Sequence, residues 1–244
     1  MAGGAEGLGS ILGVFAHPDD EAYLAGALMA VAADTGHRVV CVTATRGELG
    51  FPDDDLRSFD ERKAIREAEL RACLDVLGVR EHVWLDYPDS GCAAVPVEEP
   101  VARLRAIVDE MRPDTVLTFG PDGGTYHEDH IAVGHWTSLA CRGASSTPRL
   151  LYATNTPEWI QRWEIAVPMD GVMMVDDVAP PTTPAHELAV HLVADDELVE
   201  RKVRALRCQE TQVEPLVEQA GVDVFRVLVR EETFRAPTPD DWPT

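Results

Sequence analysis

Short apolar runs alternate with longer amphipathic stretches through the first two-thirds of the chain, and this alternation constrains the fold more than any other feature. The runs expected to be strands are residues 11–16, 38–44, 83–85, 115–119 and 150–154. The stretches expected to be helices are residues 21–33, 59–77, 97–111 and 129–141. Strands that alternate with helices in this way are typical of βαβ units. The sequence therefore predicts an α/β fold with a mostly parallel sheet flanked by helices.

The last third of the chain has a weaker pattern. Strands are expected at residues 172–175, 187–193 and 225–229, and a helix at residues 195–209 with Asp195 as its N-cap. No internal repeat or linker divides the chain. We therefore expect one α/β domain over residues 1–244, with a core at about 11–154 and a smaller, irregular, β-containing part at about 155–244.

The charge balance restricts the partners of this chain. It carries 43 acidic against 21 basic residues, a formal net charge of −22, and its pI is about 4.6. Nucleic acids and anionic membranes would be repelled over most of such a surface. No apolar run approaches the roughly 18 residues of a membrane span, and residues 1–9 lack the basic region of a secretory signal. We expect a protein that binds neither nucleic acid nor membrane.

The cysteines predict a compartment. They are odd in number and widely spaced, without a Cys-x-x-Cys pair: Cys41, Cys73, Cys92, Cys141 and Cys208. This pattern fits neither a disulfide framework nor a zinc site built from sulfur ligands. We expect reduced thiols in a cytoplasmic protein.

Dense clusters of ionisable residues follow two of the expected strands. Residues 16–21 read Ala-His-Pro-Asp-Asp-Glu after the first strand, and residues 127–130 read His-Glu-Asp-His after the fourth. Ligands of open α/β sheets bind outside the carboxyl ends of the strands. Because a parallel sheet brings such ends to one edge, the two clusters together predict a functional site.

The residue types in these clusters suit a metal ion. Imidazole and carboxylate are zinc ligands, and a catalytic zinc has three protein ligands and an open position. His17, Asp20 and His130 would make such a set, which leaves the other acids and the other histidine for proton transfer. A lone His–Asp pair is more often a helix cap or a surface acid, but two such loops at strand ends favour the metal hypothesis.

Taken together, these motifs resemble the signature of the zinc-dependent LmbE-like (PIG-L) N-acetylglucosaminyl deacetylases. The hexapeptide at residues 16–21 is followed by Gly26 in the helix, and residues 127–130 match the family's His-x-Asp-His motif. Residues 45–50 and 65–69 are further matches. The likeness covers roughly residues 11–141, with a fainter echo at 202–212.

The resemblance implies a Rossmann-like core that carries the metal site and a hydrolase that removes an N-acetyl group from an amino sugar or glycoconjugate. The implied ligands of one zinc ion per chain are His17, Asp20 and His130, and iron could fill the same site. Asp19 would be the general base. His127 would stabilise the oxyanion or protonate the amine, while Asp129 would hold the His127 imidazolium and raise its pKa.

The resemblance also implies a sugar-binding set consisting of Glu48, Arg66 and Asp89. Two of them have a specific structural alternative: Arg66 could pair with Glu61 or Glu69 on its own helix, and Glu48 could cap a loop. The acidic composition favours a neutral or cationic, aminoglycoside-like substrate over a phosphoinositide, although Arg66 could receive a phosphate. Glu21 is expected to support the site as a first-turn helix acid rather than to bind the metal.

Two departures from the family pattern put the substrate, more than the reaction, in question. Many members have Gly before and Pro after the first histidine of the second motif, where this chain has Tyr126 and Glu128. Near the C-terminus the family often shows His-x-Ser/Thr-Gln, whereas residues 209–212 read Gln-Glu-Thr-Gln. The C-terminal part is expected to shape the substrate site.

Trp159 and Trp163 are spaced four residues apart, and we expect them to pack in the core, with a sugar-stacking platform as the alternative. Two other functions stay open: an amidase of the same family that cleaves a thiol-conjugate or another non-acetyl amide, and a non-catalytic module that binds a nucleotide or sugar. The family includes homo-oligomers, but no feature of this sequence specifies one.

Overall fold

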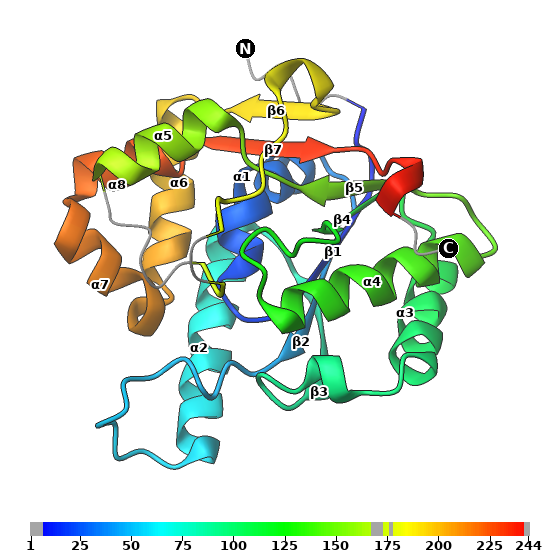
Figure 1. Ribbon diagram of the computed structural model, residues 1–244, viewed down its shortest axis with the longest axis horizontal. Coiled ribbons are helices and arrows are strands. Elements are labelled where there is room, and N and C mark those ends of the chain that lie inside the picture. Colours follow the sequence, from blue (N-terminus) through cyan, green and yellow to red (C-terminus); the bar gives the residue numbers. More distant parts are fainter. Residues whose placement is uncertain (1–6, 167–172, 176–177, 242–244) are drawn as a thin grey trace.

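A single sheet of seven strands, in the order β3-β2-β1-β4-β5-β7-β6, organises the computed structural model, which describes residues 7–166, 173–175 and 178–241 (Figure 1). The strands are β1 (Ile11–Phe15), β2 (Val39–Thr45), β3 (Glu81–Tyr87), β4 (Thr115–Phe119), β5 (Arg149–Ala153), β6 (Val190–Val193) and β7 (Glu231–Arg235). The helices are α1 (Asp20–Asp34), α2 (Phe59–Leu77), α3 (Glu98–Met111), α4 (Glu128–Gly143), α5 (Pro157–Ala166), α6 (Asp196–Arg207), α7 (Glu210–Ala220) and α8 (Val222–Leu228).

Strands β1 to β5 are parallel, and β7 and β6 continue the sheet in antiparallel pairing. The predicted mostly parallel α/β fold is therefore confirmed. In the centre of the sheet, Ile11 of β1 lies opposite Val39 on one side and Thr115 on the other. This register brings the carboxyl ends of β1 and β4 to the same edge.

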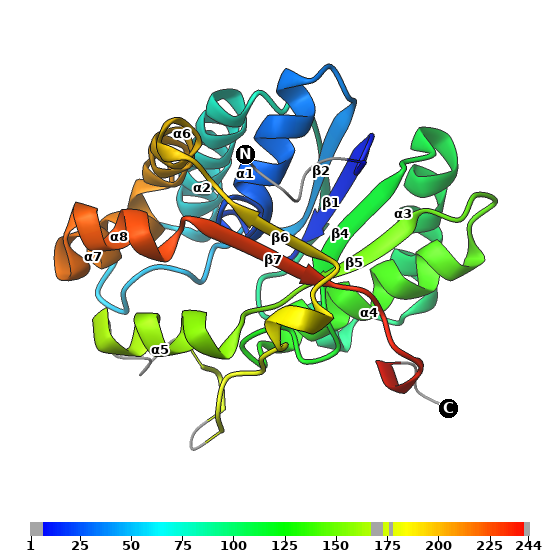
Figure 2. The same cartoon turned by 90° about the horizontal axis from the view of Figure 1, so that it is seen from above.

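Helices cover both faces of the sheet, with α1, α2 and α6 on one face and α3 and α4 on the other (Figure 2). Every residue of β1, β2 and β4 is consequently buried, which explains why these strands consist of apolar residues, glycine and threonine without a charged side chain. Among the described residues, no helix combines the length and the apolarity that crossing a bilayer requires.

Helix α2 spans the predicted residues 59–77 because local signals define both of its ends. The Ser58 side chain accepts a hydrogen bond from the Glu61 N–H, and the Glu61 carboxylate accepts one from the Ser58 N–H. Gly78 ends the helix with a φ of 80°, in the left-handed region that glycine adopts without strain.

The C-terminal part differs from several sequence expectations. The strand expected at 225–229 is wrong, since these residues belong mostly to α8 and the last strand is β7. A short apolar run does not distinguish a buried strand from a buried helix by its periodicity. Helix α7 was not expected because it contains Pro215, which usually ends a helix. The strand expected at 172–175 lies partly outside the described residues, and residues 173–175 form none.

Candidate active site

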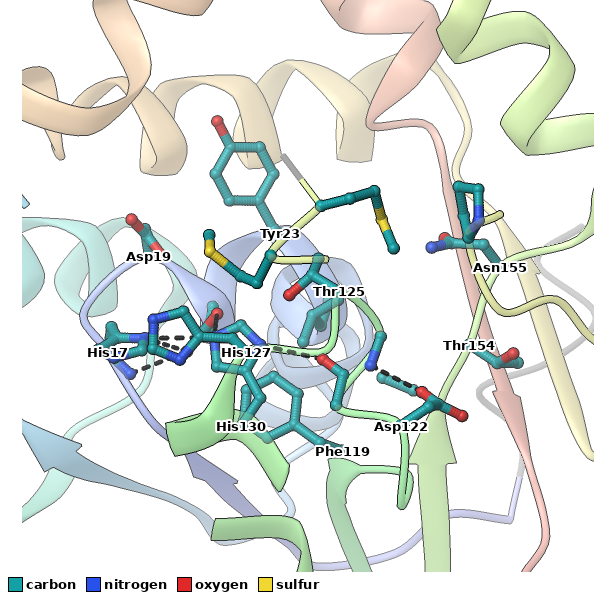
Figure 3. A pocket seen from close by; sticks show the side chains of 18 of the residues that line it. His17, Asp19, Tyr23, Phe119, Asp122, Thr125, His127, His130, Thr154 and Asn155 are labelled. Carbon is teal, nitrogen blue, oxygen red and sulfur yellow. Dashed lines mark hydrogen bonds and ion pairs between the residues drawn. The ribbon is translucent and has the colours of Figure 1, made fainter. Parts of the chain in front are cut away.

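The two predicted clusters meet at the edge of the sheet where β1 and β4 end. His17 lies between β1 and α1, and Asp20 is the first residue of α1. His127 is the N-cap of α4, and His130 lies in the first turn of this helix. Figure 3 shows the rings of His17, His127 and His130 gathered at one end of a pocket.

Three side chains present ligand atoms to one point. The Nδ1 of His17 is 3.2 Å from the Nε2 of His130 and 3.6 Å from Asp20 Oδ2, and the His130 Nε2 is 3.4 Å from Asp20 Oδ1. One ligand atom from each residue lies within 4.8 Å of the other two. Two imidazole nitrogens and a carboxylate at this spacing can hold a divalent cation.

The surroundings of His130 suit a ring that could bind a cation through Nε2. Its Nδ1 lies 3.0 Å from the carbonyl oxygen of Gly123, so a proton on Nδ1 is hydrogen-bonded and Nε2 is left for the cation. Burial lowers the pKa of His130 to about 4, which favours the neutral ring that coordination requires. The ring also stacks on Phe119, with 4.2 Å between ring centroids.

Asp129 is directed at His17, not at His127. Its fully buried carboxylate accepts hydrogen bonds from the backbone N–H groups of Ser90 and Cys92, at 2.8 and 2.9 Å. Its Oδ2 is 3.2 Å from the Nε2 of His17, and Asp89 Oδ1 is 3.3 Å from the same nitrogen. Both carboxylates therefore contact the ring nitrogen of His17 that faces away from Asp20.

The expectation for His127 needs a correction. The backbone N–H of Asp129 donates to the Nδ1 of His127 at 3.1 Å, so this nitrogen is an acceptor. Burial and the nearby His17 lower the pKa of His127, although the Asp129 carboxylate opposes the shift. The Asp129 carboxylate thus does not hydrogen-bond a His127 imidazolium, because it contacts His17 and two backbone N–H groups instead. The expected rise in the pKa of His127 is not found either.

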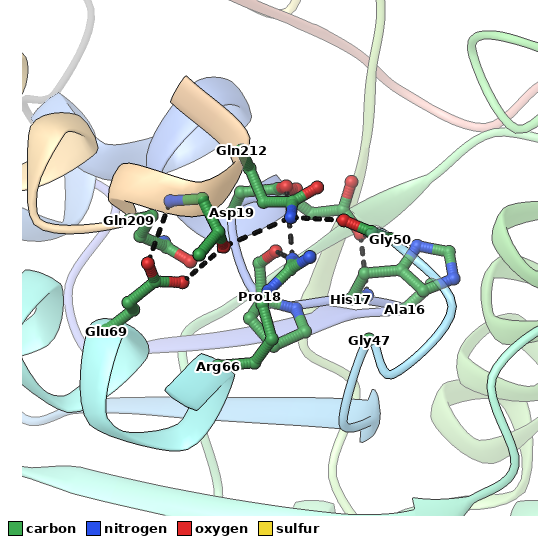
Figure 4. A network of polar contacts seen from close by, with 12 residues as sticks. Ala16, His17, Pro18, Asp19, Gly47, Gly50, Arg66, Glu69, Gln209 and Gln212 are labelled. Atoms are coloured by element: carbon green, nitrogen blue, oxygen red, sulfur yellow. Dashed lines mark hydrogen bonds and ion pairs between the residues drawn. The ribbon is translucent and has the colours of Figure 1, made fainter. Parts of the chain in front are cut away.

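Asp19 lies in a strained turn beside the candidate ligands His17, Asp20 and His130. Its φ of 108° falls in a region that side chains other than glycine rarely adopt, a kind of strain that clusters at functional sites. The backbone N–H of Asp19 donates to Glu21 at 3.0 Å, and the Arg66 guanidinium donates to the Pro18 carbonyl and, at 3.3 Å, to the Asp19 carboxylate (Figure 4). Burial raises the pKa of Asp19 to about 7, with Arg66 opposing the rise.

Arg66 is enclosed by the loop after β2. The side chain is 2% exposed, and a Cβ added to Gly50 would lie 2.7 Å from its Nη1. The alternative pairing within α2 is not observed, because Glu69 binds Thr211 and Glu61 caps the helix. Arg66 lines the pocket, but its observed partners are Pro18 and Asp19.

The other two residues of the expected sugar-binding set lie in different surroundings. Asp89 lines the pocket and accepts a hydrogen bond from the Leu49 N–H at 2.8 Å. Glu48 does not line it: the Glu48 carboxylate is 3.4 Å from Lys63 Nζ and accepts from the Asp89 N–H.

The buried side chain of Glu21 contacts the backbone of Asp19, and its partner Gln209 is a residue to which the sequence analysis had given no role. Glu21 is fully buried and accepts hydrogen bonds from Asp19, from Cys73 and from the side-chain amide of Gln209. Burial raises the pKa of Glu21 to about 8. Gln209 occupies the position of the family's histidine in the C-terminal motif, and this match of motifs was the available signal.

Tyr126 occupies a position whose backbone conformation favours glycine. Tyr126 has a φ of 60°, in the left-handed region where glycine is unstrained. It is not among the residues that line the pocket.

The pocket extends well beyond the candidate ligands. Its volume is about 580 Å³, and it reaches from His17 past Thr125 to Asn155 and Thr154 (Figure 3). Trp159 and Trp163 of α5 also line it. The two tryptophans are therefore part of the wall of the site as well as packed side chains.

Comparisons with known proteins agree with this architecture. Residues 12–141 match the family model described as GlcNAc-PI de-N-acetylase, PIG-L. The chain is 34% identical to the 1D-myo-inositol 2-acetamido-2-deoxy-alpha-D-glucopyranoside deacetylase of Acidothermus cellulolyticus, over 84% of this chain and 80% of that protein. It is also 34% identical to the deacetylase of the same name from Nakamurella multipartita, over 95% and 92% of the two chains.

A solved structure shares the fold. The N,N'-diacetylchitobiose deacetylase from Pyrococcus horikoshii superposes with a TM-score of 0.63 at 22% identity, covering 93% of this chain and 83% of that one. At this identity the likeness establishes the fold alone.

Proposed function

Because the chain belongs to the PIG-L family of GlcNAc-PI de-N-acetylases, it is an N-deacetylase of amino sugars, and we propose that it works through one divalent cation held by His17, Asp20 and His130. The observation that carries this proposal is the convergence of three ligand atoms within 4.8 Å, beside the carboxylate of Asp19. Two imidazoles and one carboxylate suit zinc, and the same set suits iron(II).

The bound cation would supply Lewis acidity, which activates water and polarises the amide carbonyl. Asp19 is the proposed general base: its carboxylate removes a proton from the water that attacks the carbonyl carbon. A carboxylate whose pKa is raised to about 7 can both accept this proton and return it near neutral pH. The proton passes to the leaving nitrogen as the C–N bond breaks, and the products are acetate and a free amine.

His127 is proposed to stabilise the developing oxyanion as a neutral hydrogen-bond donor. Its Nδ1 accepts from the Asp129 N–H, so the proton of the neutral ring resides on Nε2. A fixed N–H group beside the reacting carbonyl lowers the barrier without a net charge on the ring.

Asp129 is proposed to orient His17. A ligating histidine commonly has its second ring nitrogen bound to a carboxylate, which fixes the ring and makes it a stronger ligand. Asp129 is suited to this because two backbone N–H groups fix its carboxylate. Asp89 contacts the same nitrogen and lines the pocket, so it is proposed to contact the sugar as well.

Arg66 is proposed to position Asp19 rather than to bind the sugar, because its guanidinium contacts Pro18 and Asp19 and is almost fully enclosed. Glu48 is proposed to hold the loop that carries Asp89.

The C-terminal part is proposed to shape the substrate site, since α5, α7 and α8 contribute side chains to the pocket. Five cysteines without a disulfide support a cytoplasmic location.

The test combines metal content with acetate release. Zinc-reconstituted protein should hold about one ion per chain and release acetate from N-acetylglucosamine derivatives. Asp19→Asn should keep the ion and lose about 10²–10⁴-fold in turnover, because the general base is gone. His17→Ala should lose the ion itself. Asp34→Asn, at the exposed end of α1, is the matched control and should behave like the wild type.

Four results would contradict the proposal. Protein that stays metal-free after reconstitution would exclude the cation site. Near-normal turnover of Asp19→Asn would exclude this residue as the base. Amine release from a thiol-conjugate without acetate release from any sugar would favour the amidase alternative, and sugar binding with no turnover would favour the non-catalytic one.

A further inference from the structure

The pocket has two chemically different ends. The end next to the carboxyl ends of β1 and β4 is lined by the histidines and aspartates described above. The other end is lined by apolar side chains from the C-terminal part, namely Trp159, Ile160, Trp163, Leu216, Leu228 and Val229. Helices α5, α7 and α8, which carry most of them, lie side by side in both views of the fold (Figures 1 and 2).

These apolar side chains form a cluster of their own. Trp163 and Leu228 are buried against Trp159, Leu216 and Ala220 in a cluster distinct from the main core. The two indole rings stack with 5.0 Å between centroids. Trp159 Nε1 donates to the Leu228 carbonyl at 2.9 Å, which fixes its ring, whereas the buried Trp163 Nε1 has no partner among the described residues. The two tryptophan rings, which we call the apolar wall together with Leu228, are therefore held in place without a ligand. The Trp163 N–H is a hydrogen-bond donor without a described partner.

The charges along the described pocket disfavour an anionic group at this end. Apart from the histidines, the only cationic side chain that lines the described pocket is Arg66, which is bound to Pro18 and Asp19. Glu232 is paired with the buried Lys202, and Glu231 with Arg162 and His191. A phosphate at the apolar end would meet no unpaired cationic side chain among the described residues that line it.

We propose that the substrate is an amphiphilic N-acylated amino sugar with an apolar substituent that packs against Trp159, Trp163 and Leu228. This rests on the proposed function, because the sugar must be held with its amide at the cation site. The volume of about 580 Å³ falls in the usual range of about 300–1,000 Å³ for sites that enclose sizeable ligands, so sugar and substituent fit together. A polyol such as inositol would leave the apolar wall uncovered.

The apolar group could be joined to the glycosidic oxygen or to the amide nitrogen, and two substrate series distinguish these positions. The first compares methyl, octyl and inositol glycosides of N-acetylglucosamine. The second compares N-acetyl and N-octanoyl amides of the methyl glycoside. Zinc-loaded full-length protein is assayed for free amine with fluorescamine.

At least one series should show kcat/KM raised about 10-fold or more by the octyl or octanoyl group. Each methylene moved from water to an apolar wall contributes a factor of about four, so two suffice. The inositol glycoside should not exceed the methyl glycoside. Equal rates throughout, or a preference for inositol, would overturn the inference while leaving deacetylation intact. No amine from any compound would instead refute the proposed function.

Two variants of α5 test whether the preference for an apolar substituent depends on Trp159. Trp159→Ala should reduce the ratio of kcat/KM between the favoured apolar substrate and the methyl glycoside to about threefold or less, because most of the fixed apolar face is removed. Ile165→Ala is the matched control: Ile165 lies on the same helix, is 88% exposed and does not line the pocket, so the ratio should persist.

A binding measurement without turnover completes the test. The octyl glycoside should change the tryptophan fluorescence of the metal-free protein, and Trp159→Ala should remove this change. An unaltered ratio in Trp159→Ala would overturn the assignment of the wall, and an unaltered fluorescence change in this variant would do so as well.

Discussion

The buried ion pair between Lys202 and Glu232 allows a stability prediction. The Lys202 Nζ is 2.7 Å from Glu232 Oε1, and both side chains are 0% exposed. Lys202 also donates to the Tyr23 carbonyl at 2.8 Å, and Glu232 accepts from the backbone N–H groups of Ala27 and Leu28 at 2.6 and 2.8 Å. The pair thus joins α6 and β7 to the middle of α1, the helix that begins with a proposed metal ligand.

Lys202→Met should destabilise the protein strongly, because it keeps the apolar stem but leaves the Glu232 charge buried without its partner. Removal of one member of a buried pair costs about 3–5 kcal/mol. For a chain of this length each kcal/mol lowers Tm by about 2–4 °C, so Tm should fall by about 6–20 °C. Burial already lowers the pKa of Lys202, and Glu232 opposes this shift, which agrees with a strong dependence of the ammonium on its partner.

Urea unfolding and thermal unfolding followed by circular dichroism would measure the effect. The matched control is Arg38→Met: Arg38 is 2.6 Å from Glu81, but each side chain is 47% exposed. An exposed pair contributes little, so this variant should unfold almost like the wild type. The reasoning fails if Lys202→Met loses less than about 1 kcal/mol, or no more than the surface control.

Substitutions at three further positions test the residues around the site. Asp129→Asn should weaken metal affinity about 10–100-fold, because His17 loses a carboxylate partner. Competition with a chelator measures this affinity, and an unchanged value would contradict the orienting role of Asp129. Gln209→Leu should cost about 1–3 kcal/mol in urea unfolding because buried Glu21 loses a donor, whereas Gln209→His should retain most of the stability; equal losses would contradict the role of the donor. Tyr126→Gly should raise the free energy of unfolding by up to about 1 kcal/mol by relieving the positive φ, and a clear loss would mean that the tyrosine side chain packs.

The first five strands and the helices between them were predictable because their signals are local. A buried strand is an apolar run, and α2 has its own capping residues at both ends. The two motifs were predictable as one site for a topological reason: parallel strands end at a common edge. The C-terminal part lacked such signals, since α7 contains a proline and α8 has the apolar composition of a strand.

The sequence by itself therefore determined the α/β class and the residue types of the proposed ligand set, because spacing along the chain defines strands, helices and motifs. Only the tertiary structure decided how the charges are paired. It directs Asp129 to His17, encloses Arg66 against Asp19 and lines the far end of the pocket with two tryptophans. These contacts join residues that are tens to more than one hundred positions apart in sequence, and local periodicity carries no information about such pairs.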